Sequence, residues 1–243
     1  KMERKEKSES PPQLYDLTAL QRDANRLLGF TAQQTLDYAQ SLYEKRLITY
    51  PRTDSRFLTE DMAASLPGLV ADTGGAFAVE KPFPIHVQQV INGSKVTDHH
   101  AIVPTEGAGR ADVEALPAGE REILRLVARE LLCATGSPYR YQETAVTLSC
   151  GGNQFSAKGK AITDPGWKAY QREKVDPAKE SVLPDGLTEG MTLSVTAVTI
   201  KEGKTTAPKH YTEDTLLYAM ETAGAKDMPE DAERKGIGTP ATR

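Results

Sequence analysis

The sequence lacks any long hydrophobic run. No stretch of about 18 consecutive apolar residues occurs among its 243 residues, which excludes a transmembrane helix. The first five residues, Lys-Met-Glu-Arg-Lys, are too charged for the core of a secretory signal. Hydrophobic residues still make up 38% of the chain, which is enough to fill the cores of two ordinary domains. We therefore expect a globular protein of the cytoplasm with no membrane contact.

Cysteine and histidine are scarce. Cys133 and Cys150 form neither a disulfide framework nor a CxxC pair, so we predict both to be reduced packing residues. The four histidines include no HExxH motif. The sequence therefore predicts no metal site within this chain.

Positive charge is not in excess. The chain has 30 Lys and Arg against 34 Asp and Glu, which gives a formal net charge of −4. Such a balance provides no overall positive field to attract polyanions. Bulk charge alone argues against nucleic acid as a partner.

The nucleotide-binding motifs are incomplete. Residues 203–205, Gly-Lys-Thr, resemble the end of a P-loop, but Val198 stands where that motif requires its first glycine. Residues 236–238 lack the third glycine of a dinucleotide fingerprint, and no GxSxG elbow occurs. These absences exclude nucleotide hydrolysis, dinucleotide binding and serine-hydrolase chemistry.

Two short helices are predicted near the start of the chain. Residues 18–28 begin with capping-box spacing and carry apolar side chains at helical period, and Gly29 is placed to end the helix. A second capping box at Thr31 opens a helix whose apolar stripe runs to Leu47, where the β-prone residues 47–50 begin. Two helices, a tight turn and a strand are typical of a helix-turn-helix or winged-helix unit.

Helix and loop are predicted for much of the remainder. The polar residues 1–13 are expected to be a connector, and residues 51–119 loops and short helices. Residues 120–135 form a clear amphipathic pattern. A last helix is expected from the N-cap Thr212 to Gly224.

Between these helices the apolar period changes to that of strands. Alternation predicts a hairpin of residues 144–150 and 154–162 around a Gly-Gly-Asn turn. Residues 191–200 are predicted to form a third strand. Trp167 follows an Asp-Pro-Gly turn in this β-rich region, and we assign it to structure rather than to base stacking.

The segment from Ile48 to Ser55 carries the most chemistry. It places Tyr50 at the end of a short apolar strand and Arg52 two residues on, where strand periodicity puts both side chains on one side. A phenol has a reference pKa of about 10, and a guanidinium beside it favours the phenolate and grips phosphodiester oxygens. Attack by tyrosine on the phosphorus of a phosphodiester yields a phosphotyrosyl ester. This ester conserves the energy of the broken phosphodiester bond, so a cut nucleic-acid strand can be rejoined without ATP. The alternative is a tyrosine packed beneath a proline-stiffened turn, with a surface arginine.

Residues 48–55 and the upstream Gln-Ser-Leu-Tyr-Glu of residues 40–44 resemble the active-site signature of type IA DNA topoisomerases. In that family a tyrosine attacks the backbone and keeps the 5′-phosphate end. The resemblance covers nearly the whole chain. Further matching segments are residues 11–12, 20–21, 29–32, 99–105, 164–167, 208–213 and 236–242. The Tyr-Pro-Arg form and the paired histidines are more similar to the topoisomerase III branch than to the topoisomerase I branch.

The resemblance implies catalytic roles for three residues, Tyr50 as the nucleophile, Arg52 as its phosphate partner and His99 as the histidine near the scissile phosphate. Arg52 and His99 are thereby also DNA contacts. An imidazole here either donates to a phosphate oxygen or gates the opening of the site. The alternative is that His99 and its neighbour His100 are solvent-facing loop residues.

The resemblance also implies DNA contacts near the end of the chain. Thr242 matches the family threonine that contacts the DNA backbone. The chain departs from the common pattern at Thr239, where arginine is usual, and at Arg243, where tyrosine is usual. Arg243 is therefore the candidate that compensates for position 239. Lys209 and Tyr211 are expected to line the DNA path, with Tyr211 either stacking on a base or packing at the helix entry.

The resemblance places the magnesium ligands elsewhere. The family binds Mg²⁺ through acidic residues of an N-terminal Toprim domain, which also supplies a glutamate and a lysine to the active site. We therefore expect this chain to be a central fragment that holds the tyrosine half of a split site, binds no metal itself and is inactive alone. The expected partners are single-stranded DNA and its own missing Toprim domain, with no membrane involved, and the chain is expected to be a monomer.

The predicted fold class is α+β. We expect the chain to comprise four parts. They are a connector from a β-rich arch domain (1–13), a winged-helix-like catalytic-tyrosine domain (14–138), a β-rich arch or hinge (139–207) and the start of a helical DNA-binding domain (208–243). The predicted function is ATP-independent cleavage, strand passage and religation that relaxes or decatenates DNA. One alternative is a non-catalytic helix-turn-helix or single-strand-binding module in which Tyr50 is structural. Another is the topoisomerase part of a larger fusion such as a reverse gyrase.

Overall fold

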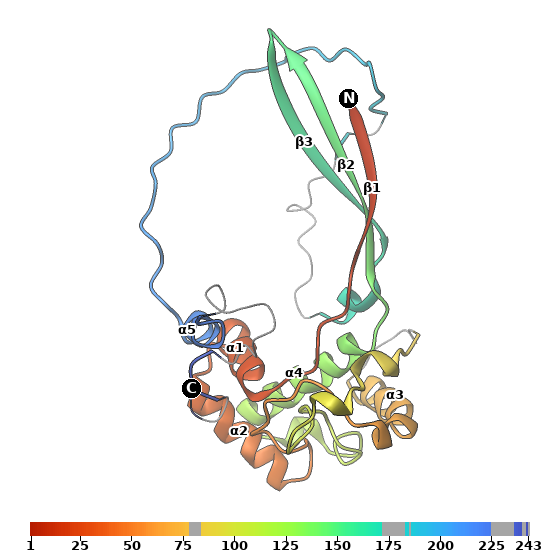
Figure 1. Ribbon diagram of the computed structural model, residues 1–243, viewed down its shortest axis with the longest axis vertical. Coiled ribbons are helices and arrows are strands. Elements are labelled where there is room, and N and C mark those ends of the chain that lie inside the picture. Colours follow the sequence, from red (N-terminus) through yellow and green to blue (C-terminus); the bar gives the residue numbers. More distant parts are fainter. Residues whose placement is uncertain (78–83, 172–182, 185, 225–235, 240–241, 243) are drawn as a thin grey trace. The chain divides into compact units, whose positions relative to one another are not determined.

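The computed structural model describes residues 1–77, 84–171, 183–184, 186–224, 236–239 and 242. It is a mixed α/β structure (Figure 1). The helices and strands are β1 (Met2–Glu9), α1 (Leu17–Leu28), α2 (Ala32–Glu44), α3 (Leu66–Ala76), α4 (Ala118–Ala134), β2 (Tyr139–Cys150), β3 (Asn153–Asp164) and α5 (Glu213–Glu221). Short 3-10 helices are η1 (Glu60–Ala64), η2 (Val87–Val90), η3 (Gly93–Lys95), η4 (Val113–Ala115) and η5 (Gly166–Tyr170).

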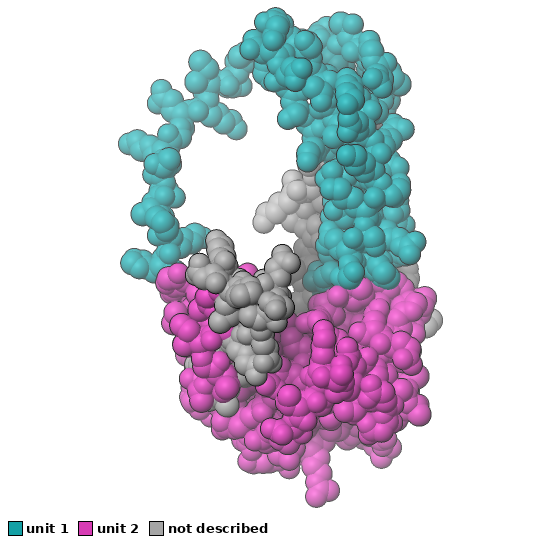
Figure 2. Space-filling view, in the orientation of Figure 1, with its two compact units in different colours: residues 1–10, 138–210 teal, residues 11–137, 211–243 magenta. Residues whose placement is uncertain are grey.

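The chain divides into two compact units. Unit 1 consists of residues 1–10 and 138–210, and unit 2 of residues 11–137 and 211–243 (Figure 2). None of the helices in the described part of the chain is both long and apolar enough to cross a membrane.

Unit 1 is built on an antiparallel sheet in the order β1-β2-β3. A two-residue turn joins β2 to β3, and its residues Gly151 and Gly152 have φ of 55° and 78°. Such a turn requires positive φ at both positions, which glycine adopts without strain. The predicted hairpin is confirmed, and both of its strands are longer than predicted.

The connector predicted for residues 1–13 contains a strand instead. β1 pairs with β2 from Met2, opposite Val146, to Glu9, opposite Tyr139. Its sequence is almost entirely charged and shows no apolar alternation. A cross-strand ion pair between Lys7 and Glu143, at 3.1 Å, accompanies the pairing. A charged edge strand of this kind carries no hydrophobic signal, because both of its faces are solvated.

The third strand predicted at residues 191–200 is wrong. These residues are extended but belong to no strand or bridge of the described chain. Their apolar side chains lie in solvent, with Val195, Val198 and Ile200 67%, 86% and 90% exposed. β-propensity measures how a side chain packs against cross-strand neighbours, and here such neighbours are absent from the described residues.

Unit 2 has a hydrophobic core between α1, α2, α4 and the loops that join them. The core residues include Leu20, Ala24, Leu42, Leu47, Ile48, Ile102, Ile123, Leu124 and Val127. The amphipathic helix predicted for residues 120–135 is confirmed as α4, which starts two residues earlier.

The helix caps of unit 2 agree with the sequence in part. Gly29 ends α1 with φ 72°, and Thr31 opens α2 with a complete capping box. The start of α1 differs, because the N-cap is Asp16, whose carboxylate accepts from the Ala19 amide at 2.7 Å. Thr18 is instead buried inside the first turn. The acidic carboxylate also interacts well with the positive end of the helix dipole.

The last helix and the two cysteines agree with the sequence in part. Thr212 caps α5 as predicted, but the helix ends at Glu221 rather than at Gly224. Cys133 is buried on α4, and burial raises the pKa of its thiol well above the usual value. Cys150 is exposed at the hairpin, so the prediction of a packing residue is wrong there.

Candidate active site

Three separated segments of unit 2 lie side by side and bring the signature residues together. The Thr49 amide donates to the Val103 carbonyl at 3.0 Å, and the Thr105 amide donates to the Leu47 carbonyl at 3.0 Å. The Ile102 amide donates to the Tyr15 carbonyl at 2.8 Å. Residues 47–49 are thereby aligned with residues 101–105.

The strand predicted at residues 47–50 is reduced to a single bridge, from Ile48 to Pro104. Proline has no backbone N–H to extend a ladder. Residues 51–52 then form a bend, with Pro51 buried and Arg52 exposed. The strand periodicity used to place Tyr50 and Arg52 on one side is therefore not present.

Tyr50 packs between two aromatic rings. Its ring is edge-on to Tyr43, with centroids 5.4 Å apart and planes at 76°. It is tilted against His99, with centroids 4.3 Å apart. Tyr43 is in the last turn of α2, and the chain reverses after it because Arg46 adopts φ 60°, where a helix usually ends in glycine.

His99 is held by the signature segment itself. The Thr53 hydroxyl donates to the His99 carbonyl at 2.8 Å and accepts from the Ser55 amide at 3.1 Å. Thr53 is 3% exposed, whereas Tyr50 is half-buried and His99 is exposed. A buried side chain thus fixes the backbone that carries the exposed imidazole.

A pocket of about 160 Å³ opens beside this imidazole. Its lining residues come from the signature, the histidine loop and the end of the chain, and are Arg52, Thr53, Asp54, Thr97, Asp98, His99 and Thr239. The Thr97 hydroxyl donates to Asp54 Oδ1 at 3.2 Å. The pocket therefore combines a guanidinium, an imidazole and hydroxyls, which can bind an anion, with the carboxylates of Asp54 and Asp98, and Tyr50 adjoins it through its contact with His99 rather than lining it.

The end of the chain contributes a residue other than the predicted one. Thr239 lines the pocket, whereas the Thr242 hydroxyl accepts from the Thr239 amide at 2.8 Å. Arg243 lies outside the described residues. Tyr211 is 72% exposed and directly precedes the N-cap of α5, so it is not packed at the helix entry.

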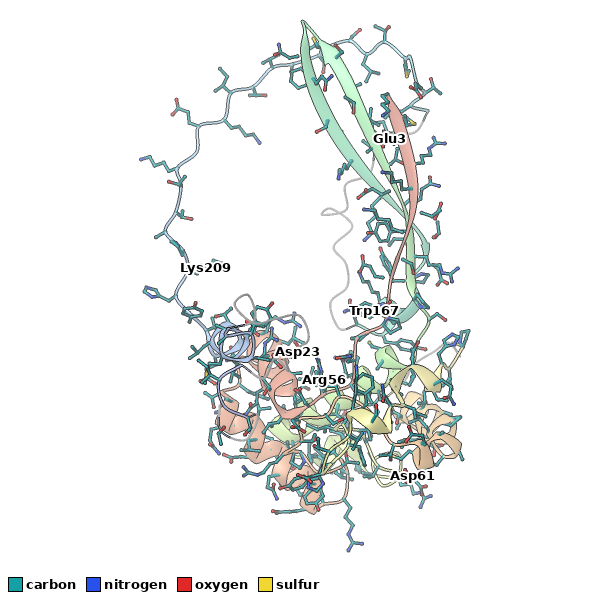
Figure 3. All side chains as sticks on the ribbon, viewed as in Figure 1. Glu3, Asp23, Arg56, Asp61, Trp167 and Lys209 are labelled. Atoms are coloured by element: carbon teal, nitrogen blue, oxygen red, sulfur yellow. The ribbon has the colours of Figure 1, made fainter. Side chains whose placement is uncertain are left out.

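Two further residues from the sequence analysis belong to unit 1. Lys209 is exposed (Figure 3). Trp167 is half-buried, and its Nε1 donates to the Glu9 carbonyl at 3.2 Å. This contact within unit 1 supports the structural assignment of Trp167.

Sequence reasoning missed three of the residues around the site. Tyr43 lies in the matched segment at residues 40–44, whose pattern indicates no role for it. Thr97 and Asp98 precede His99 in a loop without any motif. Their place in the pocket depends on how this loop folds against the signature, for which the sequence contains no signal.

The described residues do not fit a Mg²⁺ site by themselves. They contain no group of three or more His, Cys, Asp or Glu side chains that could hold a metal ion. Asp54 and Asp98 line the same pocket, and these two carboxylates alone would leave the octahedral shell of Mg²⁺ to be completed by waters or substrate phosphates.

Comparison with known proteins assigns the family. A family model described as DNA topoisomerase matches residues 1–243. DNA topoisomerase 3 of Bacillus licheniformis and that of Bacillus subtilis are each 40% identical to this chain over 96% of its length. The alignments cover 34% of each relative, so the chain spans about a third of their length.

A solved structure agrees in fold. Full-length topoisomerase I of Thermotoga maritima superposes with a TM-score of 0.74, covering 100% of this chain and 38% of that protein. The two sequences are 22% identical, so this likeness concerns the fold. Because the family model matches the whole chain, the chain belongs to the type IA DNA topoisomerase family.

Proposed function

We propose that this chain carries the tyrosine half of a topoisomerase active site, in which Tyr50 cleaves one DNA strand. The observation that supports it best is the packing of the Tyr50 ring against His99, at the pocket that Arg52 and His99 line. A nucleophile and two phosphate-binding groups are thus gathered in one place. The relatives named DNA topoisomerase 3 give the proposal its substrate, DNA.

In the proposed reaction, Tyr50 Oη attacks the phosphorus of a phosphodiester. The new bond is O–P to the tyrosine, and the bond that breaks is P–O3′. The phenolic proton is transferred overall to the departing 3′ oxygen, and the 5′-phosphate end stays on the enzyme. Religation is the reverse step and needs no ATP, because the phosphotyrosyl ester retains the energy of the broken bond.

The other residues of the pocket act on the phosphate. Arg52 grips the non-bridging oxygens with its planar guanidinium and stabilises the charge that builds on them during attack. His99 packs on the nucleophile's ring and faces the same phosphate. Thr53 and Tyr43 hold these groups in place.

At the domain level, we assign residues 14–138 to a winged-helix-like tyrosine domain and 139–207 to a β-rich arch that serves as its hinge. We assign residues 208–243 to the start of a DNA-binding domain, of which residues 211–243 belong to unit 2, and we assign Lys209, Tyr211, Thr242 and Arg243 to the DNA path. The Mg²⁺ ligands belong to a Toprim domain elsewhere in the enzyme. Movement of the tyrosine domain with the attached strand lets another strand pass, which relaxes or decatenates DNA.

A covalent-trapping experiment tests the proposal. The chain is mixed with a Toprim-containing N-terminal fragment of a relative, Mg²⁺ and a single-stranded oligonucleotide labelled at its 3′ end. We expect a denaturation-resistant labelled adduct, which Tyr50→Phe abolishes. Tyr38→Phe is the matched control, because Tyr38 packs on Phe30 with centroids 5.3 Å apart and not on the pocket.

Three results would contradict the proposal. An adduct that persists in Tyr50→Phe means that another group is the nucleophile. An adduct that carries a 5′-end label instead means that the polarity of attachment is the opposite. Unaltered DNA-dependent behaviour in Tyr50→Phe would favour the non-catalytic DNA-binding module.

A further inference from the structure

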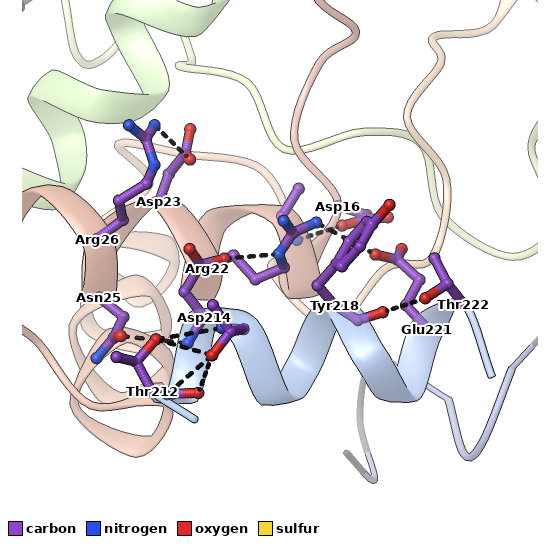
Figure 4. A network of polar contacts seen from close by, with 12 residues as sticks. Asp16, Arg22, Asp23, Asn25, Arg26, Thr212, Asp214, Tyr218, Glu221 and Thr222 are labelled. Carbon is purple, nitrogen blue, oxygen red and sulfur yellow. Dashed lines mark hydrogen bonds and ion pairs between the residues drawn. The ribbon is translucent and has the colours of Figure 1, made fainter. Parts of the chain in front are cut away.

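Arg22 of α1 connects this helix to α5 through three contacts (Figure 4). Its Nε lies 2.9 Å from Asp214 Oδ1, and its Nη1 lies 3.5 Å from Glu221 Oε2. Its guanidinium carbon lies 4.6 Å from the centroid of the Tyr218 ring. One side chain thus spans α5 from its first turn to its last residue.

The remaining contacts of α5 with its neighbours are mostly polar. Asn25 Oδ1 accepts from the Asp214 amide at 3.2 Å, and the Glu213 carboxylate accepts from the Ala32 amide at the start of α2. Of the nine residues of α5, all of which the structure describes, Leu217 is the buried one. So short a helix with one buried apolar side chain gains little from burial, so its position depends on these polar contacts.

Residues 236–239 are attached to the last turn of α5 by a backbone hydrogen bond. The Ile237 amide donates to the Met220 carbonyl at 2.8 Å. Gly236 has φ 63°, and a Cβ at this position would overlap the backbone oxygens of Met220 and Glu221. Glycine is therefore required for this close approach, which ties the segment to the helix.

Thr239, two residues beyond Ile237, lines the pocket with Arg52 and His99. A series of direct contacts therefore runs within unit 2 from Arg22 through α5 to residues 236–239 and the pocket. Arg22 itself is not among the residues that line the pocket.

We propose that Arg22 is a positioning residue of the Tyr50 site. It holds α5 on α1 and thereby keeps Thr239 beside Arg52 and His99, where the scissile phosphate binds. The catalytic part of this inference rests on the function proposed above. The structural part, that Arg22 fixes residues 236–239, does not depend on any activity.

Hydrogen exchange in the isolated chain tests the structural part. We expect the Ile237 amide to exchange at least about tenfold faster in Arg22→Ala, because its acceptor on α5 becomes mobile. Arg22→Lys keeps the charge without the planar fork and is expected to give an intermediate rate. Arg110→Ala is the matched control, because Arg110 pairs with Glu106 at 3.8 Å on the surface of the same unit.

A double-mutant cycle in the trapping assay tests the catalytic part. Arg22→Ala is expected to raise the oligonucleotide concentration for half-maximal adduct about tenfold, with a smaller effect on the maximal rate. If Arg22 acts through Thr239, adding Thr239→Val to Arg22→Ala costs less than Thr239→Val costs in the parent chain.

The outcomes separate the two proposals. An unchanged Ile237 exchange rate in both Arg22 variants overturns the positioning role, whatever the trapping assay shows. Additive effects of Arg22→Ala and Thr239→Val overturn the route through Thr239. A parent chain that forms no adduct contradicts the proposed function, while faster Ile237 exchange still supports the link from Arg22 to residues 236–239.

Discussion

At the scale of single residues, Thr53 is the side chain on which the placement of His99 depends. Its buried hydroxyl serves two backbone groups at once, the His99 carbonyl and the Ser55 amide. Removal of the hydroxyl leaves both without this partner, which typically costs about 1–3 kcal/mol for a buried group. The lost hydrogen bonds would no longer fix the backbone of His99, which positions the imidazole.

We therefore expect Thr53→Val to slow adduct formation about tenfold or more, although valine matches threonine in shape. Thr53→Ser restores the hydroxyl and is expected to stay within about threefold of the parent, with a small loss for the missing methyl group. Single-turnover trapping with saturating oligonucleotide measures both rates. Equal rates for the valine and serine variants would show that the hydrogen bond does not position His99.

At the scale of elements, residues 191–200 are an extended segment with the composition of a strand and no partner strand in the described chain. Met191, Leu193 and Val195 stand at odd-numbered positions, whereas Val198 and Ile200 stand at even-numbered positions. All five are at least 46% exposed. Unpaired backbone next to exposed apolar side chains is a template for pairing with another chain.

The isolated chain is thus expected to be a monomer at low concentration and to associate as the concentration rises. Val195→Thr combined with Val198→Thr keeps the β-branched shape, removes the apolar surface and is expected to shift association to at least about threefold higher concentration. Thr196→Val is the control, because it adds apolar surface and is expected to shift association to lower concentration. Sedimentation velocity over a concentration series measures the shift, and identical profiles for all three chains would contradict it.

At the scale of the whole molecule, a partly buried cluster of ionisable side chains makes stability depend on pH. Burial raises the pKa of Glu130 on α4 to about 8, Asp23 of α1 adds to the rise, and the nearby Arg56 and Arg26 oppose it. Tyr15 donates to Asp23 Oδ2 at 2.8 Å, and burial raises the pKa of Tyr15 as well. Asp23 and Arg56 are marked in Figure 3.

The sign of the effect follows from proton binding. A carboxyl whose folded pKa lies above its unfolded value of 4.5 binds more protons in the native state between the two values. The contribution of Glu130 to the free energy of unfolding is therefore fully present below pH 4.5 and is lost as the pH rises through about 8. We expect the free energy of unfolding to fall from pH 5 to pH 9.

Glu130→Gln removes this dependence because the amide does not ionise. The variant is expected to melt about 4 °C or more above the parent at pH 9, with a much smaller difference at pH 5. Glu106→Gln, at a carboxylate that is 75% exposed, is the control and is expected to leave the profile unchanged. Thermal melts across this pH range measure the effect, and parallel parent and Glu130→Gln profiles would contradict it.

Features that depend on neighbouring residues could be predicted from the sequence. The capping box at Thr31, the end of α1 at Gly29 and the Gly-Gly turn of the hairpin each depend on a few consecutive residues. The family could also be identified, because its signature is a continuous segment around Tyr50. Side-chain chemistry and local backbone preference suffice for such features.

The tertiary structure decided what depends on segments far apart in the chain. β1 became a strand by pairing with β2, although its own residues show no strand pattern. His99 lies on Tyr50 where backbone hydrogen bonds align their two segments, and Thr239 lines the pocket beyond residue 237, which is bonded to α5. The sequence by itself determined which chemical groups the site contains. Which of them meet was decided by long-range pairing and packing, whose free energy depends on partners that local sequence does not identify.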